Sequence, residues 1–252
     1  GIDLSRWPGY AGVWHMNEEA GTALDSSANG LHAIPAGNRN DLMIGVAGCV
    51  GKARLNQTST SYYGAQTNRL EVAASPKLDL GGKFTVSGWF KPNEGYVEFA
   101  ERLFSRKKSE SDYNGWEVSR RTLYSSTETR GIVARGASES SVSSLNFTFA
   151  ETSWHHLLFA YDEEKVTIYV NGVESATGTI AASSNDNGLP FAIGGTPTGT
   201  MHSFSGCYDE IRLRQGSVNS AWAEAEYRTV NDASFVKCSA PVRMEGMILI
   251  VR

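Results

Sequence analysis

Cysteine is scarce in this sequence: the chain of 252 residues has three, Cys49, Cys207 and Cys238, and no CxxC pair. That spacing excludes the zinc-ribbon and thioredoxin-like classes, which need closely spaced cysteines. We interpret the three residues as small buried hydrophobic side chains. One disulfide with a thiol left over is the alternative, and the sequence does not choose the pair.

Long apolar runs are absent as well. The longest, MILIV near the C-terminus, has the length of a strand and falls far short of the roughly 18 residues that span a bilayer. We therefore expect no membrane insertion. The N-terminus has no secretory signal and starts at Gly1 without a methionine, so we expect the chain to be part of a longer polypeptide.

Positive charge is not in excess. The chain has 23 Lys and Arg against 27 Asp and Glu, which gives a net charge of −4. Proteins that bind nucleic acid or anionic membranes carry a basic patch, so this balance argues against such partners.

Familiar catalytic signatures are also missing, including the GxSxG elbow, HExxH and the phosphate loop. His155 and His156 are adjacent in an alternating segment, so their rings point to opposite sides and cannot share a metal. We expect one packed ring and one exposed ring.

What the sequence does contain is short alternating segments broken by Gly, Asn, Asp and Ser. In residues 84–92, Phe84, Val86, Gly88 and Phe90 alternate with polar neighbours, as in a strand with one buried face. Residues 154–172 predict two strands around a turn at 162–165, followed by an Asn171-Gly172 turn. We count about twelve such strands.

One helix is predicted, over residues 219–230. Asn219 is a suitable N-cap, and Val218 can pack on Ala223. Helices of the length that connects parallel strands are absent between the strands, so the predicted fold is all-β: a two-sheet antiparallel sandwich with one short C-terminal helix. We place one domain at residues 1–232 and a tail or extra edge strand at residues 233–252. The Ser-rich segment 136–144 is predicted to be a hairpin loop.

Four segments carry a resemblance to a known family. They are WHMNEEAGTALDSSANGLHA (14–33), LEVAASPKLDLGGKFTVSGWFKP (70–92), SWHHLLFAYDEEKVTIYVNG (153–172) and SFSGCYDEIRLRQGSVNSAWAEAEYR (203–228). In this order they resemble the laminin-G-like, concanavalin A-like jelly-roll domains of bacterial secreted and surface proteins. The resemblance covers about residues 10–230 and implies that the first strand lies beside the CYDEIRL strand. It also implies an extracellular or cell-surface location.

The resemblance further implies a structural Ca²⁺ that ties the first turn to a late strand. Its ligands would be Asp25 and Asp209, with Asn29 or Gly30 supplying an oxygen. The alternative is that Asp25 forms an Asx-turn onto Ser27 and Asn29 while Asp209 bonds backbone across strands. Glu18 is either a third acid at the cation, a contact to the turn, or a strand-end acid that faces water.

Glycosidases of this fold carry an E-x-D-x-E strand that places three acids on one face. This chain has no such pattern: Asp209 and Glu210 alternate, and Glu98 and Glu101 are an odd number of residues apart. We therefore expect no catalytic activity.

Sugar rings are bound by exposed aromatic faces with polar groups nearby. The ligand-binding candidates in polar loops, or on the polar side of a strand, are Tyr62, Tyr63, Trp89, Tyr113, Asn114 and Trp116, with Arg106 and Arg120 nearby. Trp14 and Trp154 are expected in the core. The predicted function is a non-catalytic module that binds carbohydrate; a protein–protein adhesion module is the alternative, and a glycoside hydrolase is the weakest of the three.

Overall fold

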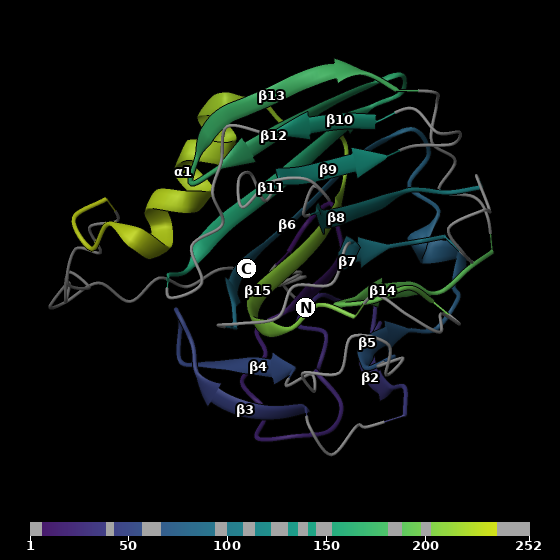
Figure 1. Cartoon of the computed structure of the whole chain (residues 1–252), viewed down its shortest axis with the longest axis vertical. Coiled ribbons are helices and arrows are strands. Elements are labelled where there is room, and N and C mark those ends of the chain that lie inside the picture. The colour runs from purple at the N-terminus through teal and green to yellow at the C-terminus, as the bar shows by residue number, and fades with distance from the viewer. Residues whose placement is uncertain are drawn as a thin grey trace, which may run out of the picture.

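The computed structural model describes residues 7–38, 43–56, 67–93, 100–107, 114–121, 131–135, 141–144, 153–180, 188–197 and 203–235. They form two stacked antiparallel sheets and one helix (Figure 1). The eight-stranded sheet has the order β13-β12-β11-β6-β15-β4-β3, with β1 paired to β15, and the seven-stranded sheet has the order β10-β9-β8-β7-β14-β5-β2. The predicted two-sheet sandwich is confirmed.

The eight-stranded sheet consists of β1 (Tyr10–Trp14), β3 (Met43–Ala47), β4 (Lys52–Asn56), β6 (Lys83–Pro92), β11 (His155–Asp162), β12 (Lys165–Val170), β13 (Val173–Thr179) and β15 (Gly206–Gln215). The seven-stranded sheet consists of β2 (Ala33–Ala36), β5 (Arg69–Val72), β7 (Ala100–Ser105), β8 (Glu117–Arg121), β9 (Gly131–Arg135), β10 (Ser141–Ser144) and β14 (Phe191–Ile193). A short 3-10 helix, η2 (Pro76–Leu78), precedes β6.

The core lies between the sheets and is rich in aromatic rings. Phe84, Val86 and Phe90 of β6 all belong to it, as the alternation of that strand predicts. Phe84 stacks on Tyr161 of β11 with ring centroids 4.4 Å apart. Gly12 matters here because a Cβ at that position would stand 2.3 Å from the ring of buried Trp14.

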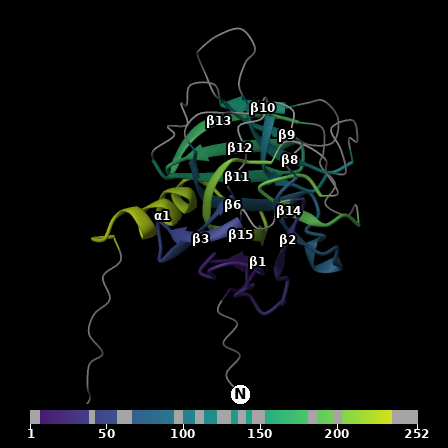
Figure 2. The same ribbon diagram turned by 60° about the horizontal axis from the view of Figure 1, so that its bottom comes forward.

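The first and last strands pair with each other, as the family resemblance implies: β1 runs antiparallel beside β15 (Figure 2). In this pairing Trp14 is opposite Ile211. β15 pairs with β4 over Gly206–Tyr208 and with β1 further along. The change of partner comes with a bulge between Asp209 and Arg212, and Glu210 has φ 48° there.

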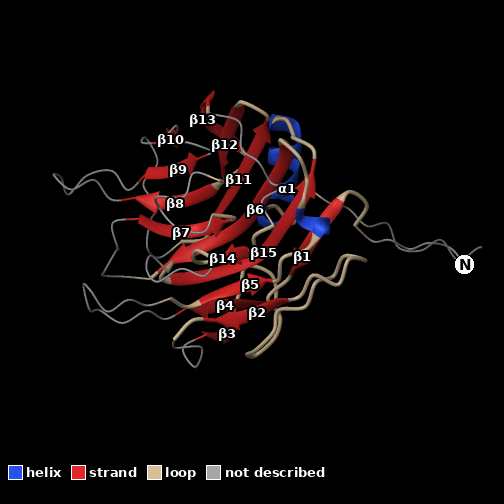
Figure 3. Cartoon of the chain, turned by 90° about the vertical axis from the view of Figure 1, so that its right-hand side faces the viewer, coloured by secondary structure: helices blue, strands red, loops and turns tan. Residues whose placement is uncertain are grey.

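The helix α1 (Ser220–Asn231) follows β15 and packs on the outer face of the eight-stranded sheet (Figure 3). Ala223 and Val218 contact Leu158, Ala160 and Tyr169 in a second apolar cluster. The Asn219 side chain accepts the N–H of Trp222, so the predicted cap is confirmed. Gly172 follows Asn171 in the tight turn between β12 and β13, and a Cβ on it would stand 3.0 Å from Cα of Glu224 on the helix.

Some predictions about elements are wrong. Residues 141–144 form strand β10 instead of part of a loop, because Val142 is buried in the core. β2, β3 and β13 were also not predicted, since their sequences lack clear alternation. Most of the tail proposed at 233–252 lies outside the described residues. Within the described part, the one α-helix has 12 residues, and no helix is long and apolar enough to cross a membrane.

Candidate functional site

Partly exposed aromatic rings and arginines gather on the outer face of the eight-stranded sheet, between α1 and β1. We call this group the aromatic–arginine cluster; it consists of Trp7, Tyr10, Arg212, Arg214 and Trp222. The residues come from the turn before β1, from β1, β15 and α1, which lie next to one another (Figure 3).

Arg214 lies at the centre of the cluster. Its guanidinium carbon is 4.4 Å from the ring centre of Trp222 and 5.7 Å from that of Tyr10. Trp222 is 41% exposed, and Tyr10 and Arg214 are half-buried. A guanidinium over an aromatic ring is attracted by the negative charge of the ring face, so these three groups hold one another in place.

Trp7 and Arg212 form the other half of the cluster. The guanidinium carbon of Arg212 is 5.7 Å from the Trp7 ring centre. The Trp7 ring lies edge-on to Tyr10 at 5.5 Å and is 5.8 Å from the His15 ring. Burial raises the pKa of the Tyr10 hydroxyl, with a further contribution from Glu226.

Two buried carboxylates fix Arg212 beneath the rings. Glu210 accepts from Arg212 at 2.9 Å, and its other oxygen is 2.7 Å from Nδ1 of His15. Glu226 of α1 lies 3.3 Å from the second Arg212 nitrogen. The hydrogen bond to Glu210 raises the pKa of His15, although burial opposes it.

Glu226 also joins the helix to the sheet. It accepts hydrogen bonds from the Ser87 hydroxyl and from the Trp222 indole, and it lies 3.3 Å from Nε2 of His156. Burial alone raises the pKa of Glu226, but the hydrogen bond and charge of His156, with Arg212 and Ser87, outweigh it and lower the pKa to about 2. The carboxylate therefore stays charged and holds Trp222 and Arg212 in one geometry.

This arrangement suits a flat, partly apolar ligand. The ring faces offer electron-rich apolar surface, and the Arg214 guanidinium supplies N–H donors beside them. Sites for small polar molecules combine these features: apolar walls with a few fixed polar groups.

The two tryptophans predicted to bind a ligand do not belong to this cluster. Trp89 is on the polar side of β6 as predicted, but α1 covers that side, and the ring is 3% exposed and stacked on Tyr227. Trp116 is fully buried in the core between Phe84 and Phe191. Neither ring is exposed, so the ligand-binding role of these two tryptophans stays a prediction that their burial does not favour. Tyr62, Tyr63 and Tyr113 lie outside the described residues, so they stay predictions.

The polar groups proposed beside those rings have structural contacts. Arg106 donates to the carbonyls of Leu78 and Leu189 at 2.7 and 3.0 Å, and Arg120 pairs with Glu101 at 3.0 Å. Both arginines are fully buried, so neither faces a ligand. Asn114 is exposed and stays a prediction.

The predictions about which rings are buried are also only partly confirmed. Trp14 is in the core, whereas Trp154 is only half-buried, with Lys91 Nζ 5.8 Å from its ring centre. His155 and His156 are both buried, at 7% and 1% exposure, so the prediction of one exposed ring is wrong. The reason is that α1 covers the face to which His156 points.

The carboxylate of Asp25 is fully engaged by hydrogen-bond donors. One oxygen accepts the N–H groups of Val13 and Ser27 at 3.0 and 2.8 Å, and the other accepts the Leu31 N–H and the Ser27 hydroxyl at 2.8 and 2.7 Å. The contact with the Ser27 N–H is that of the Asx-turn alternative, whereas the Asn29 N–H donates to the Ser27 hydroxyl at 3.2 Å. Asn29 donates to the carbonyls at positions 10 and 11, and Gly30 has φ 67° in the turn.

Asp209 holds a different segment. Its Oδ2 accepts the N–H groups of Cys49 and Val50 at 3.0 and 3.1 Å and the Cys49 thiol at 3.1 Å, and its Oδ1 accepts the N–H of Glu210. Burial raises the pKa of Asp209 to about 6 because these hydrogen bonds only partly offset it. Cys49 and Cys207 are both free thiols.

The carboxylates of Asp25 and Asp209, as they are bonded here, do not fit a calcium ion. Ca²⁺ needs six to eight oxygens with free lone pairs, and the carboxylates of Asp25 and Asp209 already accept from N–H, O–H and S–H groups. Within the part of the chain that the structure describes, no three His, Cys, Asp or Glu side chains gather at one point. Glu18 accepts the Leu24 N–H at 2.9 Å. The calcium site stays a prediction that this arrangement does not favour.

We expect Ca²⁺ to leave the melting temperature unchanged when samples in calcium chloride and in EDTA are compared by calorimetry. A cation that binds only the folded state must raise its stability, by about 2.7 kcal/mol at 100 times its Kd. A higher melting temperature in calcium, lost in the Asp25→Asn variant, would contradict the hydrogen-bonded arrangement described above.

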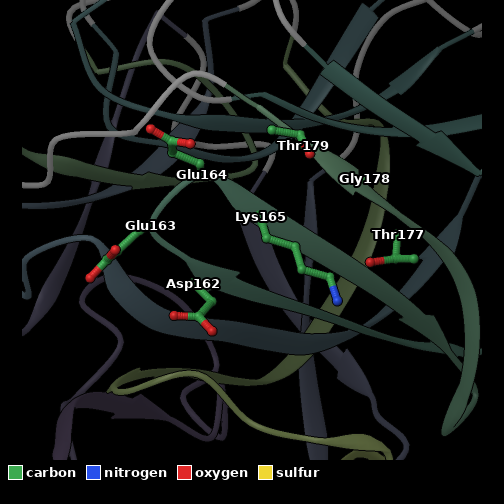
Figure 4. Close-up of a pocket in the computed structure, with 7 residues that line it drawn as sticks. All are labelled: Asp162, Glu163, Glu164, Lys165, Thr177, Gly178 and Thr179. Atoms are coloured by element: carbon green, nitrogen blue, oxygen red, sulfur yellow. The ribbon is translucent and has the colours of Figure 1, made fainter.

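A hollow of about 320 Å³ lies elsewhere, at the turn between β11 and β12 and the end of β13. Figure 4 shows Lys165 between Asp162 and Thr177, with Glu163 and Glu164 at the turn. Asp162 is already paired with Lys83 at 2.8 Å, and these side chains are largely exposed. The hollow is therefore a shallow, solvated surface beside the turn, and we do not treat it as a ligand site.

Sequence reasoning missed Trp7, Tyr10 and Trp222, although a signal was present. Arg212 and Arg214 are two residues apart on a strand and so share a face, and Trp222 and Glu226 share a helix face at i, i+4. A helix was predicted directly after this strand. Together these patterns indicate that tryptophan and arginine meet.

Comparison with known families gives one match. The model described as the concanavalin A-like lectin/glucanases superfamily, Laminin_G_3, matches residues 64–223. No curated protein matches the chain.

Several solved structures share the fold. Domain 4 of AbnA, a GH43 extracellular arabinanase from Geobacillus stearothermophilus, in complex with arabinotriose, has a TM-score of 0.64 at 21% identity over 85% of this chain and 96% of that chain. The binding domain of Paraclostridial Mosquitocidal Protein 1 has a TM-score of 0.65 at 14% identity over 89% and 53%. The botulinum neurotoxin type G receptor binding domain has a TM-score of 0.56 at 14% identity over 88% and 51%. The chain thus spans about half the length of the two toxin domains.

Proposed function

The chain belongs to the concanavalin A-like lectin/glucanases superfamily, and from this premise we propose that it is a non-catalytic binding module that takes a carbohydrate at the aromatic–arginine cluster. The observation that carries the proposal is the grouping of partly exposed Trp7, Tyr10 and Trp222 around Arg212 and Arg214. One face of a sugar ring presents C–H groups that pack on aromatic rings, while its hydroxyls accept from the N–H groups of a guanidinium.

The solved structures support a binding role. The arabinanase domain has nearly the same extent as this chain and was solved with arabinotriose, and the two toxin domains are binding domains. The fold is compatible with many functions, so the choice of carbohydrate depends on the cluster and not on the fold.

A non-catalytic role is supported by the missing E-x-D-x-E strand. The acids near the cluster, Glu210 and Glu226, are engaged with Arg212 and two histidines, and the pKa of each is lowered. A glycosidase needs one carboxylic acid with a raised pKa to protonate the leaving group. We propose a location outside the cell, since the arabinanase to which the domain is similar is extracellular.

A protein-binding module is the second candidate, favoured by one observation. Val173, the first residue of β13, is 70% exposed at the edge of a hollow of about 400 Å³ between the Asn171-Gly172 turn and α1. Tyr227 and Glu224 of the helix line the same hollow. A protein partner would bury this apolar side chain.

A glycan array probed with the labelled protein, with and without EDTA, tests the proposal. We expect binding to a set of oligosaccharides in both conditions, and weaker binding after Tyr10→Ala. Val173→Asp serves as the matched control, because it changes the other hollow and leaves the cluster intact. An array without any signal, or loss of binding in Val173→Asp with retention in Tyr10→Ala, would contradict the carbohydrate site.

A further inference from the structure

We propose that the cluster selects sugars that carry a carboxylate, and that Arg214 binds this carboxylate. The inference depends on the proposed function and adds the class of ligand. It begins from a difference between two arginines that lie two residues apart on the same face of β15.

Arg212 already has its counter-ions. Its guanidinium is 2.9 Å from Glu210 and 3.3 Å from Glu226. Only 13% of its side chain is exposed. Two carboxylates on one guanidinium leave no net positive charge for a ligand at this position.

Arg214 has none. Among the described residues no carboxylate lies within ion-pair distance of it, and its Nε is buried without a hydrogen-bond partner. Its contacts are the rings of Tyr10 and Trp222, and it is half-buried.

The contacts with the two aromatic rings leave the N–H donors of Arg214 available to a ligand. Stacking uses the flat faces of the guanidinium, whereas its N–H donors point outward in the plane. That planar fork matches a carboxylate with two parallel hydrogen bonds. Because Tyr10 and Trp222 hold the fork in one orientation, little side-chain entropy is lost when an anion binds.

The surrounding charges permit an anion. The acid nearest the cluster on α1, Glu226, is occupied by Arg212, His156, Ser87 and the Trp222 indole. Glu210 is occupied by Arg212 and His15. Arg214 covers one face of the Trp222 ring, so a sugar would lie at the edge of this pair, where the carboxylate of a uronic acid can accept from the Arg214 donors.

Isothermal titration calorimetry with two trisaccharides tests the inference. The probes are trigalacturonic acid and the same trimer with its carboxylates reduced to alcohols, so they differ only in the charged group. We expect the wild type to bind the acid about tenfold more tightly. In Arg214→Gln this preference should fall to about one, with the melting temperature retained.

Arg228→Gln is the matched control, since Arg228 is also stacked on an aromatic ring, Phe235, but lies outside the cluster and is paired with Asp232. This variant should keep the preference. Equal wild-type binding of both trimers, or a preference that survives Arg214→Gln, overturns the inference and leaves the carbohydrate site standing. A sulfated oligosaccharide that binds more tightly than trigalacturonic acid overturns the choice of carboxylate. An empty glycan array together with no binding of either trimer overturns both proposals.

Discussion

Replacement of Glu226 by glutamine is expected to lower the free energy of unfolding by about 3–5 kcal/mol at neutral pH, the range for removing one partner of a buried ion pair. The side chain is 8% exposed and faces four groups at once: Arg212, His156, Ser87 and Trp222. Without its charge, Arg212 keeps only Glu210 as a counter-ion beneath the helix. Chemical denaturation followed by far-UV circular dichroism measures the change.

The destabilisation should also depend on pH. The folded-state pKa of Glu226 is lowered to about 2 from a usual value of 4.5, so its contribution to stability is fully present above about pH 4.5. As the pH falls from 4.5 toward 2, the wild type protonates this group and loses the contribution, while the glutamine variant has nothing to lose at this position. The difference between the two proteins should therefore shrink in acid.

Glu224→Gln provides the matched control on the same helix. Glu224 is 61% exposed and pairs with Arg228 at 3.4 Å, an i, i+4 contact that contributes about 0.2–0.5 kcal/mol. Loss of the Glu224 charge should change the free energy of unfolding by no more than this contribution. A Glu226→Gln protein as stable as the control, or a difference independent of pH, would contradict the role of Glu226 in joining α1 to the sheet.

The second large effect is expected on ligand binding: Trp222→Ala should weaken glycan affinity at least about tenfold, equivalent to about 1.4 kcal/mol. The ring is the most exposed member of the cluster, and exposed tryptophans carry a large share of the binding energy where they contact a ligand. Its loss also frees Arg214 from one of its two aromatic contacts. The affinity is measured by calorimetry with the glycan of strongest array signal.

Phe235→Ala separates a binding role from a general effect of removing an aromatic ring. Phe235 is 37% exposed and has Arg228 over its ring at 4.5 Å, so it repeats the arginine–aromatic pair at a distant point after the same helix. We expect the glycan affinity of the Phe235→Ala variant to equal that of the wild type. Equal losses in the two variants, or none in Trp222→Ala, would place the ligand elsewhere.

The fold followed from the sequence where side chains alternate strictly. In β6 the residues Phe84, Val86 and Phe90 face the core as the pattern predicts, and the Asn171-Gly172 turn has the positive φ angles of 50° and 80° that this dipeptide favours. The helix was predicted from its cap at Asn219. Strand β10 was missed because one buried apolar residue, Val142, is too little to mark a strand in a Ser-rich segment.

The site was harder to predict because alternation shows which face a side chain takes but not what covers that face. Trp89 lies on the polar side of β6, which suggested a ligand, but α1 folds back over it, and the ring is buried against Tyr227. Trp116 follows a polar turn but points inward, one residue before β8 begins. Their burial depends on contacts between residues far apart in the sequence.

The aromatic–arginine cluster has the same long-range character. Tyr10 and Arg214 become neighbours only because β1 pairs with β15, and Trp222 joins them only because α1 packs beside that pair. A sequence pattern gives the local i, i+2 and i, i+4 relations within each element. It does not give the pairing of the first strand with the last, which here came from the family resemblance.

The most direct test of the carbohydrate site is an NMR titration that follows the six tryptophan indole N–H signals as the glycan of strongest array signal is added. We predict shifts of the Trp7 and Trp222 signals, with those of buried Trp14, Trp89 and Trp116 unchanged. Unchanged Trp7 and Trp222 signals at saturating glycan would contradict the account.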